Sequence, residues 1–511
     1  MMSKSRIFTF LWTAAVCALY AVHLFHLRAD FPNYSPWMDY SKYTDEGWYG
    51  SAAVRYILTG SWRVQGDFNP AAAVPMWPVL EGLVFHFTGV SIVAARALTL
   101  VVFGANLLLT WALFRVQQQK TWTTLLAVTL LAGNAFLYSF SRLALLEPAL
   151  IFWTLLAWLL ILRAPEAAGA RVRCTFLVAA GLCLCLAILT KTTGIFLLPA
   201  AFYLLWHSAE HRVRVFARYA AVTGAAAGIS WSAYYFLLVH PRYLNDYYYL
   251  FAVNQMPQPV TVGGWIGAFW YAAHGALWID KPLTVLTAVL IVFSVFFLRR
   301  VWRNGLFPAA LLAIAGYVLF IGYHNNMQPR YYQVIAFPLV FVLCLGLAAL
   351  WERWRWAGMG ALAVVLASLA LNLRMVAGYA RHPEYTFVNA ANELTRYIDQ
   401  HSEDGNRLLL SISGADITLI THLPSICDDF GTYDLPYRIH TYHPGWYAAW
   451  NELDPGSVAD INTQYSLKEV AHFPAFDDPD RDDLVLYKMV PLPAEKQTYN
   501  AAEEVAENAG K

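Results

Sequence analysis

The chain has 511 residues, of which 58% are hydrophobic and 14% are charged, and its formal net charge is +1. Soluble domains carry roughly 25% charged residues, so this composition is typical of a membrane protein. The near-zero net charge argues against an electrostatic nucleic-acid binder, and we expect no nucleic acid partner. The six cysteines lie mostly in or beside apolar runs and predict no disulfide framework.

Apolar runs long enough to cross a bilayer recur along the first three quarters of the chain. The first follows Lys4 and Arg6 and lacks a convincing small-residue cleavage site, so it is interpreted as a retained span. We therefore predict an α-helical polytopic protein with about eleven transmembrane helices. They are expected at 7–26, 91–114, 121–140, 147–163, 174–190, 193–206, 219–239, 282–298, 306–323, 333–350 and 359–375.

Basic residues cluster in every second connection between these runs, which predicts a cytoplasmic N-terminus. With eleven spans, the C-terminus then lies outside the cell, in a multi-pass protein of the plasma (inner) membrane. The same alternation places most of the unusual polar residues on the outer side. We expect the functional site on that outer, extracytoplasmic face.

The first outer loop, residues 27–90, is too long to be a simple turn. It contains Asp45 and Glu46, followed by helical spacing of apolar residues up to Gly60, and then a proline-rich stretch with a second apolar segment. Two helices in the membrane interface fit this pattern. Two adjacent carboxylates at such a helix start could accept a proton from a substrate, or could serve only the helix dipole.

Five further residues at the outer rim are candidates for substrate binding: Arg96, Arg142, Glu147, Lys191 and Arg330, the last followed by Tyr331. A planar guanidinium beside aromatic rings suits phosphate binding. Each also has a plain structural interpretation. Arg96 could extend to the headgroups, Glu147 could start a helix before a proline, and Lys191 could mark a hairpin tip.

The sequence has no metalloprotease motif, no Walker loop and no dinucleotide-binding glycine pattern. Asp45, Glu46 and Glu147 could together hold a divalent cation, since hard cations take oxygen ligands. The nearby basic residues favour direct charge stabilisation instead. We therefore predict no metal site and no cofactor, and a divalent cation remains the less favoured alternative.

The part after the last span changes in composition at Arg381, and the expected domains are 1–380 in the membrane, 381–493 as a soluble extracytoplasmic α/β domain, and 494–511 as a loose acidic tail. A helix is expected at 390–401 with Asn389 as its N-cap, and strands at 407–413, 417–423, 469–476 and 483–489. The aromatic outer loop 240–281 is either a membrane anchor or a cover over the active site.

Taken together, the order and side of these motifs resemble the GT-C superfamily of membrane glycosyltransferases, over roughly residues 7–375. The resemblance is strongest to protein O-mannosyltransferases and the lipid A aminoarabinose transferase. Its carriers are Asp45-Glu46 after the first span, the proline-rich loop leading to Arg96, the segment from Arg142 to Glu147, Lys191, and Arg330-Tyr331. Glu147 stands where many relatives have an aspartate, and the C-terminal part differs from the binding modules of the best-known members.

The resemblance implies inverting transfer of a sugar from a polyprenyl-phosphate donor to a hydroxyl acceptor, which is a lipid, a glycan or a protein. It makes Asp45 the general base and Glu46 its partner or an acceptor-orienting neighbour. Fixed positive charge suits the departing lipid phosphate, with Arg330 first and Lys191, Arg142 and Arg96 behind it. The alternatives are a transferase of oligosaccharides or phospho-groups, a secondary transporter and a structural scaffold, although no internal repeat supports a transporter.

Overall fold

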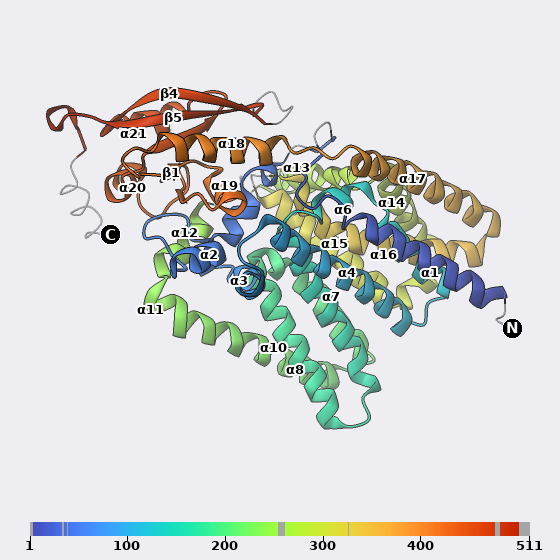
Figure 1. Cartoon of the computed structure of the whole chain (residues 1–511). Helices are drawn as coiled ribbons and strands as arrows, with labels where there is room; N and C mark the ends of the chain where they lie inside the picture. Colours follow the sequence, from blue (N-terminus) through green and yellow to red (C-terminus); the bar gives the residue numbers. More distant parts are fainter. Residues whose placement is uncertain are drawn as a thin grey trace.

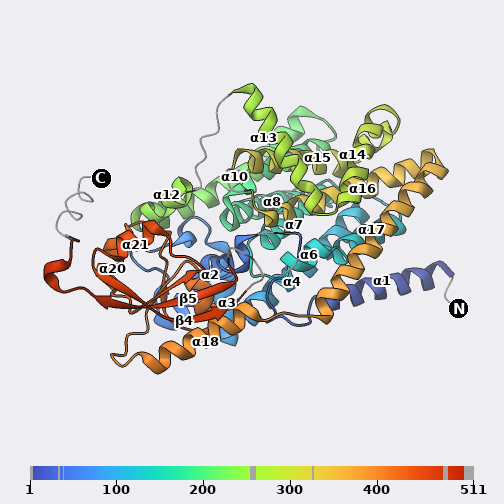
Figure 2. The same cartoon turned by 90° about the horizontal axis from the view of Figure 1, so that it is seen from above.

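The computed structural model describes residues 4–32, 35–37, 39–253, 261–324, 327–475 and 481–499. Helices make up most of the chain, and all strands lie after residue 408. The N-terminus and the strand-containing C-terminal domain lie at opposite ends of the molecule (Figures 1 and 2). The expected α-helical membrane protein with a small C-terminal α/β domain is therefore confirmed.

Seventeen helices precede the C-terminal domain in the described residues. Some are only one or two turns long, and several follow the expected spans closely. They are α1 (Lys4–Val22), α2 (Asp45–Thr59), α3 (Met76–Thr88), α4 (Ile92–Val116), α5 (Thr121–Ala132), α6 (Ala135–Phe140), α7 (Glu147–Arg163), α8 (Ala170–Thr190), α9 (Leu198–Ser208), α10 (Val213–Tyr234), α11 (His240–Arg242), α12 (Leu244–Val253), α13 (Val262–Gly275), α14 (Lys281–Phe296), α15 (Leu306–Tyr323), α16 (Tyr332–Arg353) and α17 (Arg355–Arg381).

Seven helical stretches in the described chain are long and apolar enough to cross a membrane, and three shorter apolar helices accompany them. The count of eleven spans stays a prediction. One expected span, 121–140, is divided into α5 and α6, because the side chain of Asn134 accepts the backbone N–H of Leu137 at 2.9 Å and starts a new helix. Another, 193–206, begins as a 3₁₀ helix (Thr192–Leu197) and only then becomes α9.

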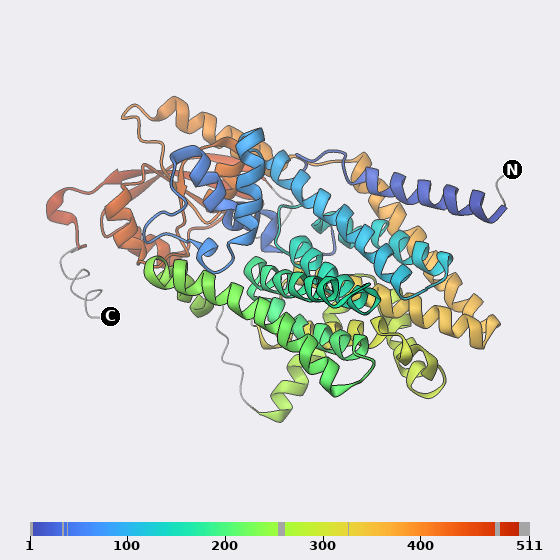
Figure 3. The same cartoon turned by 90° about the horizontal axis from the view of Figure 1, so that it is seen from below.

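Helix α16 forms the centre of the bundle. Almost all of its residues are buried, and it packs against α5, α7, α14, α15 and α17. By contrast, α10 buries few side chains and exposes large apolar ones such as Val213 and Ile229. It lies beside α8 at the edge of the bundle (Figures 1 and 3). An outward apolar face of this kind is the surface that lipid covers.

Residues 27–90 contain the two helices α2 and α3, with a short 3₁₀ turn before each. Gly60 ends α2 in the left-handed region, with a φ of 78°, and its N–H bonds to the carbonyl of Tyr56 at 2.9 Å. This segment packs against the C-terminal domain, and α2 contacts the helix α19 (Gly414–Thr421) directly. The loop after the first helix therefore forms the platform on which the C-terminal domain sits.

The C-terminal domain has a five-stranded sheet in the order β2-β1-β3-β5-β4. The neighbours β2, β1 and β3 are parallel, whereas β3, β5 and β4 are antiparallel. Its elements are α18 (Thr386–His401), β1 (Leu409–Leu410), α19 (Gly414–Thr421), β2 (Ser425–Ile426), α20 (Leu435–Tyr442), β3 (Trp446–Trp450), α21 (Pro455–Ile461), β4 (Tyr465–Pro474) and β5 (Asp483–Pro491).

The strands expected at 407–413, 469–476 and 483–489 correspond to β1, β4 and β5. Residue 476 and residues 500–511 of the expected loose tail lie outside the described residues. The strand expected at 417–423 is wrong, since this stretch forms α19 and a turn. A short apolar run does not distinguish a strand from a buried helix. Helix α18 begins at Thr386, before Asn389, because the carboxylate of Asp30 accepts its first N–H groups, from Phe387 at 2.8 Å and from Val388 at 3.3 Å.

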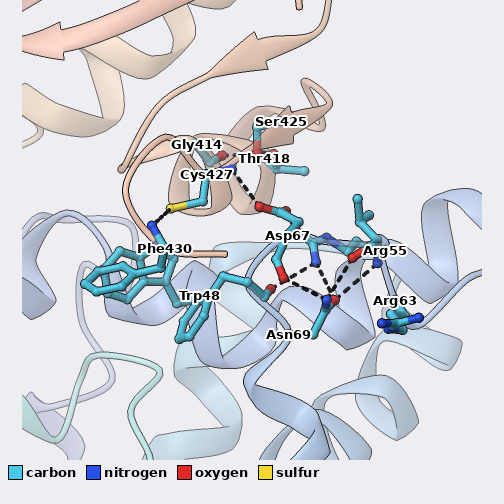
Figure 4. Close-up of polar contacts among 12 residues, drawn as sticks. Trp48, Arg55, Arg63, Asp67, Asn69, Gly414, Thr418, Ser425, Cys427 and Phe430 are labelled. Atoms are coloured by element: carbon cyan, nitrogen blue, oxygen red, sulfur yellow. Dashed lines mark hydrogen bonds and ion pairs between the residues drawn. The ribbon is translucent and has the colours of Figure 1, made fainter. Parts of the chain in front are cut away.

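Polar contacts fasten the C-terminal domain to the loop after α2 (Figure 4). The carboxylate of Asp67 pairs with Arg55 through one oxygen, and its other oxygen accepts the backbone N–H of Cys427 at 3.0 Å. The backbone N–H of Tyr433 donates to the carbonyl of Gly66 at 3.0 Å. Because Asp67 and Cys427 are buried, losing one partner of these bonds would leave a buried polar group unsatisfied, which is costly.

A close backbone approach between the two parts lies at Gly47, in the first turn of α2. Its N–H donates to the carboxylate of Asp416, and the space where a Cβ atom would stand is filled by the backbone of Ala415 and Asp416. Only glycine allows this approach. The Asp-Glu-Gly sequence thus joins the start of α2 to α19.

We predict that Gly47→Ala lowers the free energy of unfolding by about 1–3 kcal/mol, the usual range for overpacking against an atom that cannot move. The control is Gly228→Ala in α10, where a Cβ would meet open space, and where alanine adds up to about 1 kcal/mol of helix propensity. Thermal unfolding of the purified protein in detergent measures both. Equal melting temperatures for the two variants would contradict the close contact.

Candidate active site

Asp45 is the first residue of α2, and its side chain is almost completely buried. One carboxylate oxygen lies 2.8 Å from the guanidinium of Arg330, and the other accepts the hydroxyl of Thr44 at 3.1 Å. Burial raises the pKa of Asp45 to about 6, against the opposing charge of Arg330 and with further increases from Asp39 and Glu147. The group therefore changes protonation close to neutral pH.

Arg330 lies in the 3₁₀ turn Pro329–Tyr331 at the start of α16 and is also buried. Besides Asp45, its guanidinium contacts the carboxylate of Asp39 at 2.5 Å, and its backbone N–H donates to the second Asp39 oxygen at 2.9 Å. The planar guanidinium suits this double pairing because it offers several N–H groups in fixed directions. Arg330 thus ties two carboxylates of the first loop to the central helix.

Lys191 and Glu147 form a second buried ion pair in the same region. The ammonium group of Lys191 lies over the ring of Tyr331, 4.2 Å from its centroid, and the guanidinium of Arg330 lies 4.9 Å from the same centroid. Cations over an aromatic face are attracted by its negative charge. The ring of Tyr331 therefore joins the two ion pairs into one charged cluster.

Glu46 lies beside this cluster but makes different contacts. Its two oxygens accept from Arg96 at 2.8 Å and 2.6 Å, and one also accepts the backbone N–H of Ala144 at 2.7 Å. Arg96 in turn donates to the carbonyls of Leu27 and Ala29. This bidentate pair connects α2 to α4 and to the segment after α1, so Glu46 and Arg96 hold these three parts in position.

Arg142 contacts the N-terminal segment and not Asp45. Its guanidinium donates to the carbonyls of Phe25 and His26 at 2.7 Å and 2.6 Å, and to the hydroxyl of Tyr138 at 2.6 Å. Of the eight residues predicted from the sequence, the structure thus gathers Asp45, Glu147, Lys191, Arg330 and Tyr331 into one cluster. It places Glu46 with Arg96 beside that cluster, and Arg142 nearer the end of α1.

Three buried acids of this region were missed by the sequence interpretation. Asp39 shares Arg330 with Asp45, and Asp416 of α19 holds the N–H of Gly47. Glu81 of α3 is fully buried against Gly50 of α2. Burial and the nearby charge of Glu46 raise the pKa of both Asp416 and Glu81 well above the usual range. Asp39 had a weak signal, since it precedes Asp45 by six residues, but Asp416 is 369 residues from Gly47.

No group of three or more histidine, cysteine, aspartate or glutamate side chains is placed to hold a metal ion in the part of the chain that the structure describes. The three carboxylates considered for a cation from the sequence are instead each paired with a basic side chain: Asp45 with Arg330, Glu46 with Arg96 and Glu147 with Lys191. The site is therefore organised by charge pairing between side chains.

Comparison with known proteins agrees with this architecture. Residues 74–254 match the family model for dolichyl-phosphate-mannose-protein mannosyltransferase, and no curated protein matches the sequence. The structure is similar to that of ArnT from Cupriavidus metallidurans in the apo state, at 13% identity, over 98% of this chain and 100% of that chain, with a TM-score of 0.63. The chain has the GT-C fold.

Two further structures share this fold. ArnT from the same organism bound to undecaprenyl phosphate is 13% identical, over 96% of this chain and 99% of that chain, with a TM-score of 0.61. The oligosaccharyltransferase of Archaeoglobus fulgidus in complex with zinc and sulfate is 14% identical, over 93% of this chain and 72% of that chain, with a TM-score of 0.54. The resemblance to the GT-C glycosyltransferases expected from the sequence is thus confirmed.

We predict that Glu46→Gln destabilises the protein by about 3 kcal/mol or more, because it leaves the buried charge of Arg96 without its partner. The matched control is Glu166→Gln, which breaks a pair with Arg163 whose two side chains are about half exposed. Exposed pairs contribute little to stability. The measurement is thermal unfolding in detergent, followed by tryptophan fluorescence. A control that loses as much stability as Glu46→Gln would contradict the structural role of this pair.

Proposed function

We propose that the protein is a membrane glycosyltransferase that moves a sugar from a polyprenyl-phosphate donor to a hydroxyl acceptor. The GT-C fold, the partial match to a mannosyltransferase family model and the buried charged cluster support this function. The structural neighbour with bound undecaprenyl phosphate supports the class of donor. The donor sugar is a hexose or a pentose, and the acceptor is a lipid, a glycan or a protein.

The observation that carries the proposal is the position of Asp45. Glu46 and Glu147 each have a basic partner of their own, whereas Asp45 shares Arg330 with Asp39. Burial, which the charge of the shared Arg330 offsets only in part, raises the pKa of Asp45 to about 6. A general base works best when its pKa lies near the operating pH, so Asp45 is the carboxylate suited to accept a proton.

In the proposed reaction, Asp45 takes the proton of the acceptor hydroxyl as that oxygen bonds to the anomeric carbon. The bond between this carbon and the phosphate oxygen breaks, and the electron pair leaves with the lipid phosphate. One displacement of this kind inverts the anomeric configuration. The leaving group is already an anion, so fixed positive charge assists it more than a proton would.

Arg330 and Lys191 are the proposed partners of the departing phosphate, and both sit on the ring of Tyr331. A donor phosphate that binds Arg330 competes with Asp45 for the guanidinium. The carboxylate of Asp39 keeps Arg330 in place, because it accepts both the backbone N–H and a guanidinium N–H of Arg330. Donor binding then frees Asp45 to act as the base. In this scheme Arg96, Arg142 and Glu46 hold the site together from its edge.

We further propose that no cofactor takes part and that the reaction occurs on the extracytoplasmic face of the plasma (inner) membrane. The basic residues of every second connection support a cytoplasmic N-terminus, and the C-terminal domain lies at the other end of the molecule. In this orientation, the cluster around Asp45 lies on the outer side with the C-terminal domain.

We predict that Asp45→Asn lowers the rate of donor consumption by about 10²–10⁴-fold, the usual contribution of base catalysis. Purified protein is incubated with a panel of polyprenyl-phosphate sugars, and loss of donor is followed by mass spectrometry. The control is Asp399→Asn, which removes a half-exposed aspartate paired with Arg407 in the C-terminal domain. A folded Asp45→Asn protein with full activity would exclude Asp45 as the base, and ion-coupled uptake into vesicles without turnover would support a transporter.

The pH dependence follows from the same residue. The base must be ionised, and ionised Asp45 is the form present above its pKa, so activity should rise with pH through about 6 and then level off. This rise of activity with pH should be absent from the residual activity of Asp45→Asn and unchanged in Asp399→Asn. A rate that is constant from pH 5 to 8 in the wild-type protein would contradict the assignment.

A further inference from the structure

A second charged region lies around the last residues of α16, at the end of this helix opposite to Arg330. Here the turn from α4 to α5, the end of α14, the following 3₁₀ helix Arg299–Arg303 and the end of α16 surround a cavity of about 660 Å³. This volume is in the range of small-molecule sites in proteins. The proposed glycosyl transfer makes no use of it.

One side of this cavity is strongly basic. Its lining includes four cationic side chains and a single acidic one, Glu352, which pairs with Lys120 at 2.8 Å. The remaining cations are Arg300, Arg303 and Arg353. Cationic groups gathered around one recess repel each other, and an anion placed among them would remove that repulsion.

The 3₁₀ helix explains why two of these arginines point the same way. Such a helix has three residues per turn, so residues i and i+3 lie on one face. Arg300 and Arg303 have this spacing, and both line the cavity. Arg299, in the same helix, does not line it, and its guanidinium donates to the carbonyl of Val295. The arrangement is therefore more specific than a general excess of basic residues in a membrane loop.

The other side of the cavity is apolar. It consists of side chains on one face of α16 together with the last residues of α14 and the start of the 3₁₀ helix, namely Leu345, Ala348, Ala349, Phe297, Leu298 and Val301. A free phosphate would make no favourable contact with these apolar side chains, whereas a lipid acyl chain would pack against them. The cavity is thus basic at one edge and apolar at the other.

We propose that this cavity binds the headgroup of an anionic phospholipid from the leaflet at the N-terminal end of the bundle. Arg300 and Arg303 hold the phosphate, and an acyl chain lies along Ala348 and Ala349. Basic pockets between transmembrane helices are a general solution for such headgroups. The lipid would hold the 3₁₀ helix and α14 against α16, and it would stabilise the folded protein in proportion to its free concentration.

The first test measures binding of dioleoylphosphatidylglycerol to the delipidated protein in detergent, by native mass spectrometry and by thermal shift, with dioleoylphosphatidylcholine as the neutral probe. The variant is Arg300→Gln with Arg303→Gln, and the control is Arg299→Gln with Arg214→Gln, where Arg214 is an exposed residue of α10. Both variants lose two positive charges.

We expect the wild-type protein and the control to bind the anionic lipid equally, and the lining variant to bind it about 10- to 30-fold more weakly, since each arginine near the headgroups contributes roughly a fivefold factor. Equal loss in the control and the lining variant would mean that only the total charge matters, and it would overturn the site. Unchanged binding by the lining variant would overturn it as well.

A second test separates a lipid from a free phosphate. Ala349→Trp should fill the apolar wall and weaken phosphatidylglycerol binding, while the arginines stay in place. Inorganic phosphate at millimolar concentration should stabilise the wild-type protein much less than the lipid does. If inorganic phosphate gives the full thermal shift and Ala349→Trp leaves lipid binding unchanged, the site takes phosphate and the lipid assignment fails. Neither test depends on the glycosyltransferase activity.

Discussion

The pairing of Arg330 with Asp39 and Asp45 is the interaction on which the rest of the site depends. Arg330 stands at the start of the central helix α16, and both carboxylates belong to the long segment between α1 and α4. Charges buried this deeply are tolerated only when they are paired and hydrogen bonded, so the loop can take one position on the helix bundle. The start of α2 is then fixed, and with it the places of Glu46 and Gly47. The Lys191–Glu147 pair is held against the same arginine through the ring of Tyr331.

The C-terminal domain belongs to this arrangement and is more than an appendage. Its helix α19 meets the first turn of α2 at Gly47, and Asp416 accepts the N–H that the first turn of a helix otherwise leaves unsatisfied. This close backbone contact lies two residues from Asp45, and burial is the main cause of the raised pKa of Asp45. The C-terminal domain thus contacts the turn that holds Asp45, although the two lie more than 350 positions apart in the sequence.

Much of this structure could be predicted from local signals. The apolar runs predicted the helical bundle. The charged residues at the ends of these runs singled out Asp45, Glu147, Lys191 and Arg330 as site candidates, because an acid or a base near a membrane needs a partner. Contacts made only by the folded chain were out of reach. Nothing near Asp416 indicates that it binds Gly47, and Arg142 looks like a phosphate ligand until its carbonyl partners are known. The strand predicted at 417–423 was wrong for a different reason, since its apolar run is compatible with a strand or with the helix that forms.

The two ends of the bundle use the same residue type in opposite ways. Around Asp45, Arg96 and Arg330 are buried and each has a carboxylate partner, so their charges are balanced inside the protein and their directions are fixed. At the N-terminal end, Arg300 and Arg303 are exposed side chains around a cavity, where a single acid balances several bases. Fixed, paired charges suit a reaction, because they need no reorganisation when new charge develops. Excess, mobile charges suit a surface that gathers anions, because the compensating charge must then come from outside the protein. This difference in compensation, more than the number of basic residues, separates the catalytic role proposed at one end from the binding role proposed at the other.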